Sequence, residues 1–532
     1  MAFEREGAAS ERGLVGLALA LGAGDCGVIS AGERALALGA SRVGRVEVAA
    51  ARRRIAAGED ALGEALLALR SARERRPLGA VYTPAVIVRA MADWAAAMPG
   101  AKPVRVVDAG AGSGRFLLEA GRTFPKAELV GVELDPLAAL LLRANLVAGG
   151  FAKRSRVIVD DFRDVALDAC AGRTLFVGNP PYVRHHALGA AGKRWFAESA
   201  RKFGFSASKL AGLHVHFALA TALQARPGDL GVLVTAAEWL DVHYGALLRE
   251  LFLGPLGGLS LHLIEPTARP FADADTTAAI TCFEVGTAAP SIQLRRVRSL
   301  AQLSPLTGGR KISRELLART SRWTPLTRPA AQKPAGYVEL GELCHVHRGQ
   351  VTGHNRVWIA GEHSASLPSR LLYPAITKAR ELFAAGHALS DARTLRKIID
   401  LPADLGELGA ADRRAVERFL RLARELGADR GFVAQHRKAW WSVGLRAPAP
   451  ILATYMARRP PAFVRNLAAA RHINIAHGLY PREPLSDPML DALALHLSKH
   501  TQVSAGRTYS GGLTKFEPKE MERLWVPGPG LL

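Results

Sequence analysis

The chain has 532 residues, of which 49% are hydrophobic, and this composition excludes a generally disordered protein. Lysine and arginine number 70 against 48 aspartates and glutamates, so the formal charge of +22 favours a polyanionic partner such as nucleic acid. The four cysteines form no CxxC pair and no histidine pair has zinc spacing, which predicts a protein of the reducing cytoplasm without a metal site.

Residues 1–75 are predicted to form a helical N-terminal extension. The apolar run GLVGLALALGAG at 13–24 lacks the basic flank of a signal peptide and is too short to span a bilayer, so we expect a packed helix and no membrane contact. Residues 50–76 place leucine and alanine on one helical face and charges on the other. The sequence assigns no chemistry to this extension.

Between residues 104 and 285, short β-branched runs alternate with helical stretches, which is typical of a doubly wound α/β sheet. Residues 295–333 then contain ten lysines and arginines, one acid, prolines and a glycine pair. We interpret them as a basic linker or a DNA-facing segment and expect a domain boundary near residue 300.

The stretch VVDAGAGSGRFLLEA at 106–120 reads as a strand that ends at Asp108, followed by a glycine turn and a helix. Gly110, Gly112 and Gly114 would let the backbone approach a ligand closely while helix N–H groups point at it. Arg115 stands where a dinucleotide fingerprint has its third glycine, so the spacing suits S-adenosylmethionine better. By itself the motif is equally compatible with a structural turn or a nucleotide site.

Two further strand ends supply acidic residues beside the glycine turn. Glu133 ends the run ELVGVELD, where a carboxylate can accept both hydroxyls of a ribose. Asp161 and Phe162 follow the next strand, where they could accept from an adenine amino group and stack on its ring. The alternatives are a solvated carboxylate for Glu133 and a helix cap for Asp161.

The fourth strand ends in the sequence GNPPYVRHH at 178–186. Pro180 and Pro181 remove two backbone donors and fix two φ angles beside the amide of Asn179. If the Asn179 side-chain oxygen and the Pro180 carbonyl each accept one N–H of an aromatic amine, its lone pair can turn toward an electrophilic methyl group. Tyr182 would then stack on the base, although an ordinary proline turn with a surface tyrosine is the alternative.

Together these motifs resemble the TaqI-like, γ-class adenine-N6 DNA methyltransferases of restriction-modification systems, over roughly residues 78–532. The resemblance implies a seven-stranded class I S-adenosylmethionine-dependent methyltransferase domain at 76–300 and a mixed α+β target-recognition domain at 301–532. It implies transfer of a methyl group from S-adenosylmethionine to N6 of a flipped-out adenine in double-stranded DNA.

The resemblance also assigns further residues. Tyr82, Thr83 and Pro84 match the motif that contacts the methionine carboxylate of the cofactor, and Asp108 would hold its ammonium group. Phe271 matches the aromatic residue on the opposite side of the flipped adenine, although a core phenylalanine would look the same in sequence.

Double-stranded DNA is the expected partner, and the sequence allows a separately encoded restriction endonuclease, since the N-terminal extension is too short for a nuclease domain. We expect a monomer on DNA, in the cytoplasm and associated with the nucleoid. The alternatives are an RNA or protein-glutamine N-methyltransferase and a non-catalytic DNA-binding specificity subunit. The long basic C-terminal half favours DNA, and the complete motifs favour an enzyme.

Overall fold

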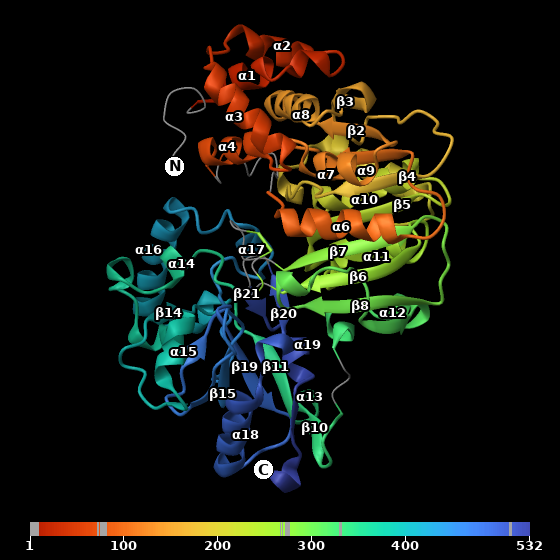
Figure 1. Ribbon diagram of the computed structural model, residues 1–532. Coiled ribbons are helices and arrows are strands. Elements are labelled where there is room, and N and C mark those ends of the chain that lie inside the picture. The colour runs from red at the N-terminus through yellow and green to blue at the C-terminus, as the bar shows by residue number, and fades with distance from the viewer. Residues whose placement is uncertain are drawn as a thin grey trace. The chain divides into compact units, whose positions relative to one another are not determined.

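The computed structural model in Figure 1 describes residues 10–71, 74, 82–265, 268, 270–271, 277–328, 332–509 and 513–532. The chain divides into two compact units. Unit 1 contains Met1–Ala330 with Ser510–Gly512, and unit 2 contains Ala331–Tyr509 with Leu513–Leu532. This division falls later than the boundary near residue 300 that the sequence suggested, because a strand formed beyond that residue belongs to the sheet of unit 1.

The centre of unit 1 is a nine-stranded sheet in the order β3-β2-β1-β4-β5-β7-β6-β8-β9. Strands β3, β2, β1, β4 and β5 run parallel, and β7 lies antiparallel between β5 and β6. Because the strand order reverses between β1 and β4, a ligand crevice is expected at the carboxyl ends of these strands. The strands are β1 (Arg105–Ala109), β2 (Glu128–Glu133), β3 (Ser155–Val159), β4 (Thr174–Gly178), β5 (Leu230–Ala236), β6 (Gly258–Ile264), β7 (Ala278–Glu284), β8 (Ser291–Val297) and β9 (Arg310–Ser313).

Helices cover both faces of this sheet (Figure 1). Val106 of β1 lies in one core cluster with Ile87 of α6 and Leu117 of α7, whereas the next residue, Val107, lies in another with Phe217 of α10. Successive strand residues face opposite sides, so β1 is buried on both. The predicted doubly wound α/β fold is confirmed, with nine strands instead of seven. The helices are α6 (Ala85–Ala97), α7 (Arg115–Thr123), α8 (Pro136–Ala148), α9 (Ala190–Arg201), α10 (Leu213–Gln224) and α11 (Ala246–Leu253).

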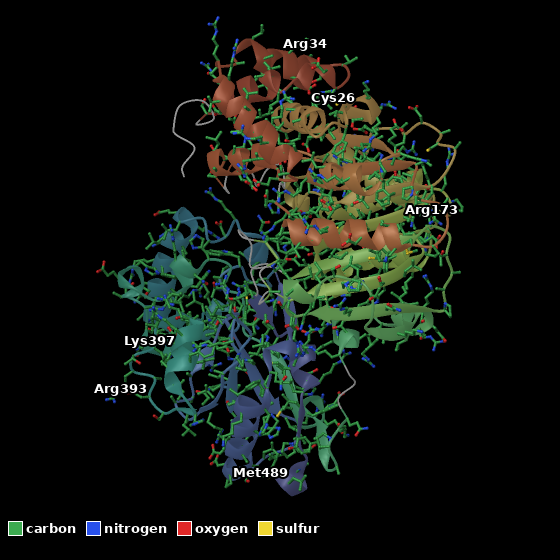
Figure 2. The ribbon with its side chains drawn as sticks, in the orientation of Figure 1. Cys26, Arg34, Arg173, Arg393, Lys397 and Met489 are labelled. Carbon is green, nitrogen blue, oxygen red and sulfur yellow. The ribbon has the colours of Figure 1, made fainter. Side chains whose placement is uncertain are left out.

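The N-terminal extension packs on α8 through a cluster that joins Leu14 to Leu140. Glu33 and Arg143 form an ion pair at 2.7 Å inside this contact, with side chains 0% and 1% exposed. Arg143 also donates to the carbonyl of Cys26, which is labelled in Figure 2. The extension is therefore part of the core of unit 1. Its helices are α1 (Glu11–Ala20), α2 (Ala31–Leu38), α3 (Arg45–Ala56) and α4 (Ala61–Leu69).

The basic segment 295–333 does not form the linker that its composition suggested. Its first residues complete β8, and β9 pairs antiparallel with that strand. Arg314 donates to the carbonyl of Gly258 at 2.7 Å, and Arg296 donates to the Glu265 carboxylate at 2.7 Å. Arg296 and Arg314 therefore form hydrogen bonds inside unit 1, and the basic composition of this part of the segment does not indicate a solvent-exposed linker.

Unit 2 is a mixed α+β domain, as the sequence predicted. A five-stranded sheet has the order β11-β19-β15-β17-β13, and a three-stranded sheet has the order β14-β12-β18. The fully buried Trp358 packs edge to face on Phe419, with ring centroids 5.9 Å apart. The main elements are β11 (Cys344–Arg348), β12 (Leu372–Ile376), β13 (Ala388–Leu389), β14 (Lys397–Ile399), β15 (Ile451–Thr454), β17 (Phe463–Asn466), β18 (Arg471–His472), β19 (Ala476–Pro481), α16 (Ala410–Glu425) and α18 (Asp487–His500).

Within the described residues, no helix combines the length and the apolar character needed to cross a bilayer.

Candidate cofactor and base-binding site

The predicted glycine turn connects β1 to α7. Gly110, Gly112 and Gly114 all have positive φ angles, of +79°, +55° and +93°. A Cβ at Gly114 would come 2.3 Å from the Leu142 side chain, whereas a Cβ at Gly112 would meet nothing within 4 Å. Gly114 therefore brings the turn against α8, and Gly112 leaves one side of the backbone open to a ligand.

Asp108 and Glu133 stand at the carboxyl ends of β1 and β2. Asp108 is fully buried, and neither of its carboxylate oxygens has a hydrogen-bond partner among the described residues. Burial, and then the neighbouring Glu133, raises the pKa of Asp108 well above its ordinary value. Glu133 accepts from the N–H groups of Gly112 at 2.7 Å and Asp135 at 2.9 Å, while burial raises its pKa. The edge of the sheet thus carries two carboxylates suited to a cationic or hydroxyl-bearing ligand.

Asp161 and Phe162 lie at the end of β3, as predicted. Burial disfavours the charge of Asp161, but hydrogen bonds from Arg163, one of them at 2.5 Å, outweigh this and lower its pKa. The Phe162 ring is 1% exposed and lies 5.6 Å from the ring of Phe217, in the core cluster. The Phe162 ring was expected from the sequence to stack on an adenine, but in the structure neighbouring residues bury it.

The motif at 82–84 meets the NPPY segment. Thr83 is buried, and its Oγ1 accepts from the Asn179 amide nitrogen at 3.0 Å. Pro84 caps α6, and the Tyr82 hydroxyl donates to Glu64 at 2.9 Å. Thr83 therefore holds the amide nitrogen of Asn179 at the end of β4.

The NPPY segment lies against the glycine turn because Gly178 ends β4 without a side chain. A Cβ at Gly178 would come 2.5 Å from an Asp108 carboxylate oxygen, and a Cβ at Gly110 would lie 3.4 Å from Pro181. Asn179 and Pro180 follow directly. The structure thus brings together the two motifs that the sequence separates by 65 residues or more.

Tyr182 and Phe271 also come together, with ring centroids 6.5 Å apart and an interplanar angle of 64°. Phe271 is 3% exposed. The rings meet edge to face, so stacking a base between them requires one ring to turn. His214, which the sequence analysis missed, lies 6.3 Å from the Tyr182 ring, and burial lowers its pKa to about 4, so it is neutral near pH 7.

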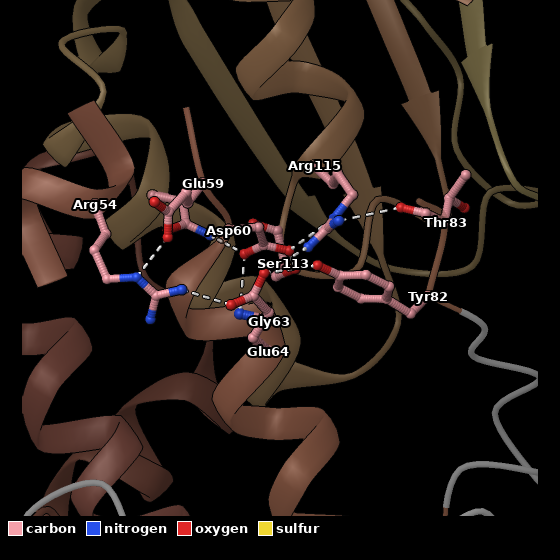
Figure 3. A network of polar contacts seen from close by, with 10 residues as sticks. Arg54, Glu59, Asp60, Gly63, Glu64, Tyr82, Thr83, Ser113 and Arg115 are labelled. Atoms are coloured by element: carbon pink, nitrogen blue, oxygen red, sulfur yellow. Dashed lines mark hydrogen bonds and ion pairs between the residues drawn. The ribbon is translucent and has the colours of Figure 1, made fainter. Parts of the chain in front are cut away.

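A polar network in Figure 3 connects the N-terminal extension to this site. Asp60, at the N-cap of α4, accepts from the Ser113 hydroxyl at 2.6 Å and pairs with Arg115 at 3.4 Å. Arg115 in turn donates to the Thr83 carbonyl at 3.2 Å. No sequence pattern indicates Asp60, because its partners Ser113 and Arg115 lie 53 and 55 residues away along the chain.

Comparisons with known proteins agree with this arrangement. Residues 58–207 match the family model for N-6 DNA Methylase, and residues 326–531 match the model for the C-terminal domain of type II methyltransferase M.Eco57I. The chain is 56% identical over 449 residues to the type II methyltransferase M.XamI of Xanthomonas campestris pv. amaranthicola, an alignment that covers 84% of this chain and 85% of that protein.

Two solved structures show a similar fold. The type IIG restriction endonuclease BpuSI has a TM-score of 0.51 at 16% identity, with coverage of 98% of this chain and 70% of its own. The type IIL restriction-modification enzyme MmeI, solved in complex with DNA, has a TM-score of 0.54 at 13% identity, with coverage of 86% and 70%. At these identities the likeness concerns the fold.

Proposed function

Because the chain belongs to the type II adenine-N6 DNA methyltransferases, we propose that its catalytic centre is the sheet edge where Asp108, Glu133 and Asn179 meet. The enzyme transfers a methyl group from S-adenosylmethionine to N6 of adenine at a specific DNA sequence. The family, cofactor and reaction implied by the resemblance are confirmed. The roles of individual residues are our proposal.

The residues present fit S-adenosylmethionine, which supplies an electrophilic methyl group on a sulfonium ion. Asp108 is a buried carboxylate with no donor among the described residues, so it would accept from the methionine ammonium group. Each oxygen of Glu133 accepts one backbone N–H and keeps a lone pair for a ribose hydroxyl. Asp161 would accept from the adenine amino group, whereas the buried Phe162 ring packs on Phe217.

We propose that the segment 82–84 keeps the role that the resemblance implies. Thr83 Oγ1 accepts from Asn179, which leaves its own proton available for the methionine carboxylate, whereas the Tyr82 hydroxyl donates to Glu64. In the glycine turn, the N–H groups of Gly110, Gly112 and Gly114 already donate to protein acceptors.

The observation that carries the catalytic proposal is the Asn179 amide, held by Thr83 at the end of β4. With its nitrogen on Thr83, the amide can present its oxygen to one N–H of the target amine, and the Pro180 carbonyl can accept the other. These acceptors stabilise the charge that develops on the amine nitrogen and direct its lone pair at the methyl group. The bond from the methyl carbon to sulfur breaks as the bond to N6 forms, S-adenosylhomocysteine is the leaving group, and the extra proton on N6 passes to water.

The target adenine must leave the duplex to reach this edge, and we propose that Tyr182 stacks on the extruded base. Phe271 would cover the other face after one of the two rings turns from its edge-to-face position. A stacked base contributes about 1–3 kcal/mol, which offsets part of the cost of unstacking.

We further propose that unit 2 selects the DNA sequence, since its match is to the C-terminal domain of another type II methyltransferase. Catalytic and recognition parts on one chain are consistent with action as a monomer at the nucleoid. A separately encoded restriction endonuclease is a further partner that we propose.

The test uses the purified full chain with S-adenosylmethionine and a plasmid library, and maps N6-methyladenine by single-molecule sequencing. Wild type should methylate one sequence. Asn179→Ala should reduce the single-turnover rate by about 10²- to 10³-fold, because one transition-state acceptor is lost. Calorimetry with S-adenosylhomocysteine should show cofactor affinity within a few fold of wild type. Activity of Asn179→Ala close to wild type would contradict the role of the amide.

A further inference from the structure

The N-terminal extension reaches the cofactor site through one buried carboxylate. Asp60 is 3% exposed, and three short hydrogen bonds hold its carboxylate: Oδ1 accepts from Gly63 N–H and from Asn145 Nδ2, each at 2.9 Å, and Oδ2 accepts from Ser113 Oγ at 2.6 Å. Ser113 lies inside the glycine turn, between Gly112 and Gly114. The Asp60 carboxylate, at the N-terminus of α4, thus connects the N-terminal extension to the glycine turn.

The approach of α4 to the turn requires a glycine. A Cβ at Gly63 would come 2.3 Å from Ser113 Oγ and 2.2 Å from an Asp60 carboxylate oxygen. Asn145 of α8 closes the same contact, since its Nδ2 also donates to the Ser113 carbonyl at 2.8 Å. The glycine turn, α4 and α8 therefore meet at Ser113.

From Asp60 a chain of contacts continues through Arg115 to Thr83 (Figure 3), and from Thr83 to Asn179. Arg115 pairs with Asp60 at 3.4 Å, and its guanidinium lies 3.4 Å from the centre of the Tyr82 ring. The same guanidinium donates to the Thr83 carbonyl at 3.2 Å. Thr83 Oγ1 then accepts from Asn179 at 3.0 Å. Arg115, the residue that breaks the dinucleotide fingerprint, connects the glycine turn to the segment that holds the amide.

We propose that Asp60 is a positioning residue of the methyltransferase: it fixes the glycine turn through Ser113 and, through Arg115 and Thr83, the amide of Asn179. The N-terminal extension then contributes a positioning residue to the catalytic centre. This inference rests on the proposed roles of the glycine turn and Asn179.

The central variant is Asp60→Asn in the full chain, which keeps the size of the side chain but removes its charge and two of its acceptor positions. Loss of charged hydrogen bonds should weaken S-adenosylhomocysteine binding by about 10- to 100-fold. The turnover at saturating cofactor and DNA should also fall by about 10- to 100-fold, because the amide is displaced. A purely structural role would lower the melting temperature and leave the saturated turnover of the folded protein unchanged.

Glu59→Gln is the matched control. Glu59 is the neighbouring residue, its side chain is 50% exposed, and it pairs with Arg54 at 2.6 Å. This variant also removes one carboxylate from the extension, but one that pairs with Arg54 on the exposed surface, so it should keep wild-type affinity and turnover.

A double-mutant cycle tests the chain of contacts. Arg115→Lys keeps the charge but cannot reach Asp60 and Thr83 in the same fork geometry. If both residues act on Asn179 through one path, the double variant should be no slower than the slower single variant. Additive losses in turnover would overturn the path through Arg115.

Two further outcomes separate this inference from the proposed function. If Asp60→Asn does not fold, Ser113→Ala, which removes one hydrogen bond to the same carboxylate, should weaken cofactor binding by about 2- to 10-fold, and unchanged binding would overturn the inference. Wild-type turnover by folded Asp60→Asn would overturn it while leaving the methyltransferase intact. If wild type and Glu59→Gln both fail to methylate adenine, the proposed function is at fault.

Discussion

Replacing Asp108 by asparagine should make the enzyme bind its cofactor more weakly and yet fold more stably. Asp108 is fully buried without a donor among the described residues, and burial raises its pKa. An ammonium group placed there would form a charged hydrogen bond of about 1.5–3 kcal/mol. Asp108→Asn should therefore raise the dissociation constant of S-adenosylhomocysteine by about 10- to 150-fold.

The stability effect has the opposite sign. Below about pH 4 the Asp108 side chain is protonated in both the folded and the unfolded chain. As the pH rises, the unfolded chain loses this proton first, because the pKa of Asp108 is raised in the folded protein. The contribution of Asp108 to the free energy of unfolding therefore falls between about pH 4 and its raised pKa. The Asp108→Asn variant lacks this decrease in the free energy of unfolding. Near neutral pH its melting temperature should therefore equal or exceed that of wild type.

Calorimetry and thermal unfolding of the full chain measure both effects. Below the raised pKa of Asp108, cofactor affinity of wild type should increase with pH by up to about one log unit per pH unit from this group, since binding requires the carboxylate. The variant should lack this component. Asp160→Asn, at an exposed position after β3, is the control with the same charge change. A variant that binds like wild type, or that melts lower than wild type near neutral pH, would refute the reasoning.

Two other sites yield predictions from their contacts. Tyr182→Phe should keep activity within a few fold, because it keeps the ring that stacks on the base and because the contact of the hydroxyl with the Val234 carbonyl is long, at 3.5 Å, whereas Tyr182→Ala should lose about 1–3 kcal/mol of stacking. A fluorescent adenine analogue at the target position should brighten less with the alanine variant, and equal losses in both variants would point to the hydroxyl. Glu33→Ala should destabilise unit 1 by about 3–5 kcal/mol in urea unfolding, because it leaves the Arg143 guanidinium buried without its anion. Adding Arg143→Met should restore much of that stability, and a double variant as unstable as Glu33→Ala would contradict the charge argument.

The sequence predicted the strand ends and the glycine turn because both depend on local patterns. Alternating apolar runs mark buried parallel strands, and the carboxyl ends of such strands meet at one edge. From this alone, Asp108, Glu133 and Asn179 could be expected to lie together. Tyr82, Thr83 and Phe271 came only from the resemblance, since nothing in their local sequence indicates chemistry.

Contacts between distant segments could not be predicted. Asp60 is the N-cap residue of α4, whose amphipathic sequence indicates no function. Its contacts with Ser113 and Asn145 depend on the packing of α4 and α8 on the glycine turn. The composition of residues 295–333 predicted a linker or a DNA-facing segment, whereas Arg314 and Arg296 donate to a carbonyl and a carboxylate inside unit 1. Composition does not separate that use of arginine from contact with DNA.

Gly178 sets a limit on redesigning this enzyme. Efforts to change the accepted base or cofactor would start from libraries at the residues around each ligand. The missing side chain at position 178 lets an Asp108 oxygen lie where a Cβ would be 2.5 Å away, so in the arrangement that we propose a single backbone segment separates the cofactor from the target base. Any other residue there would push apart the ends of β1 and β4, and the φ of +152° also disfavours a side chain. Selection for a new substrate should therefore leave glycine at 178 in every active clone, and changes on the base side should have to be optimised together with changes on the cofactor side.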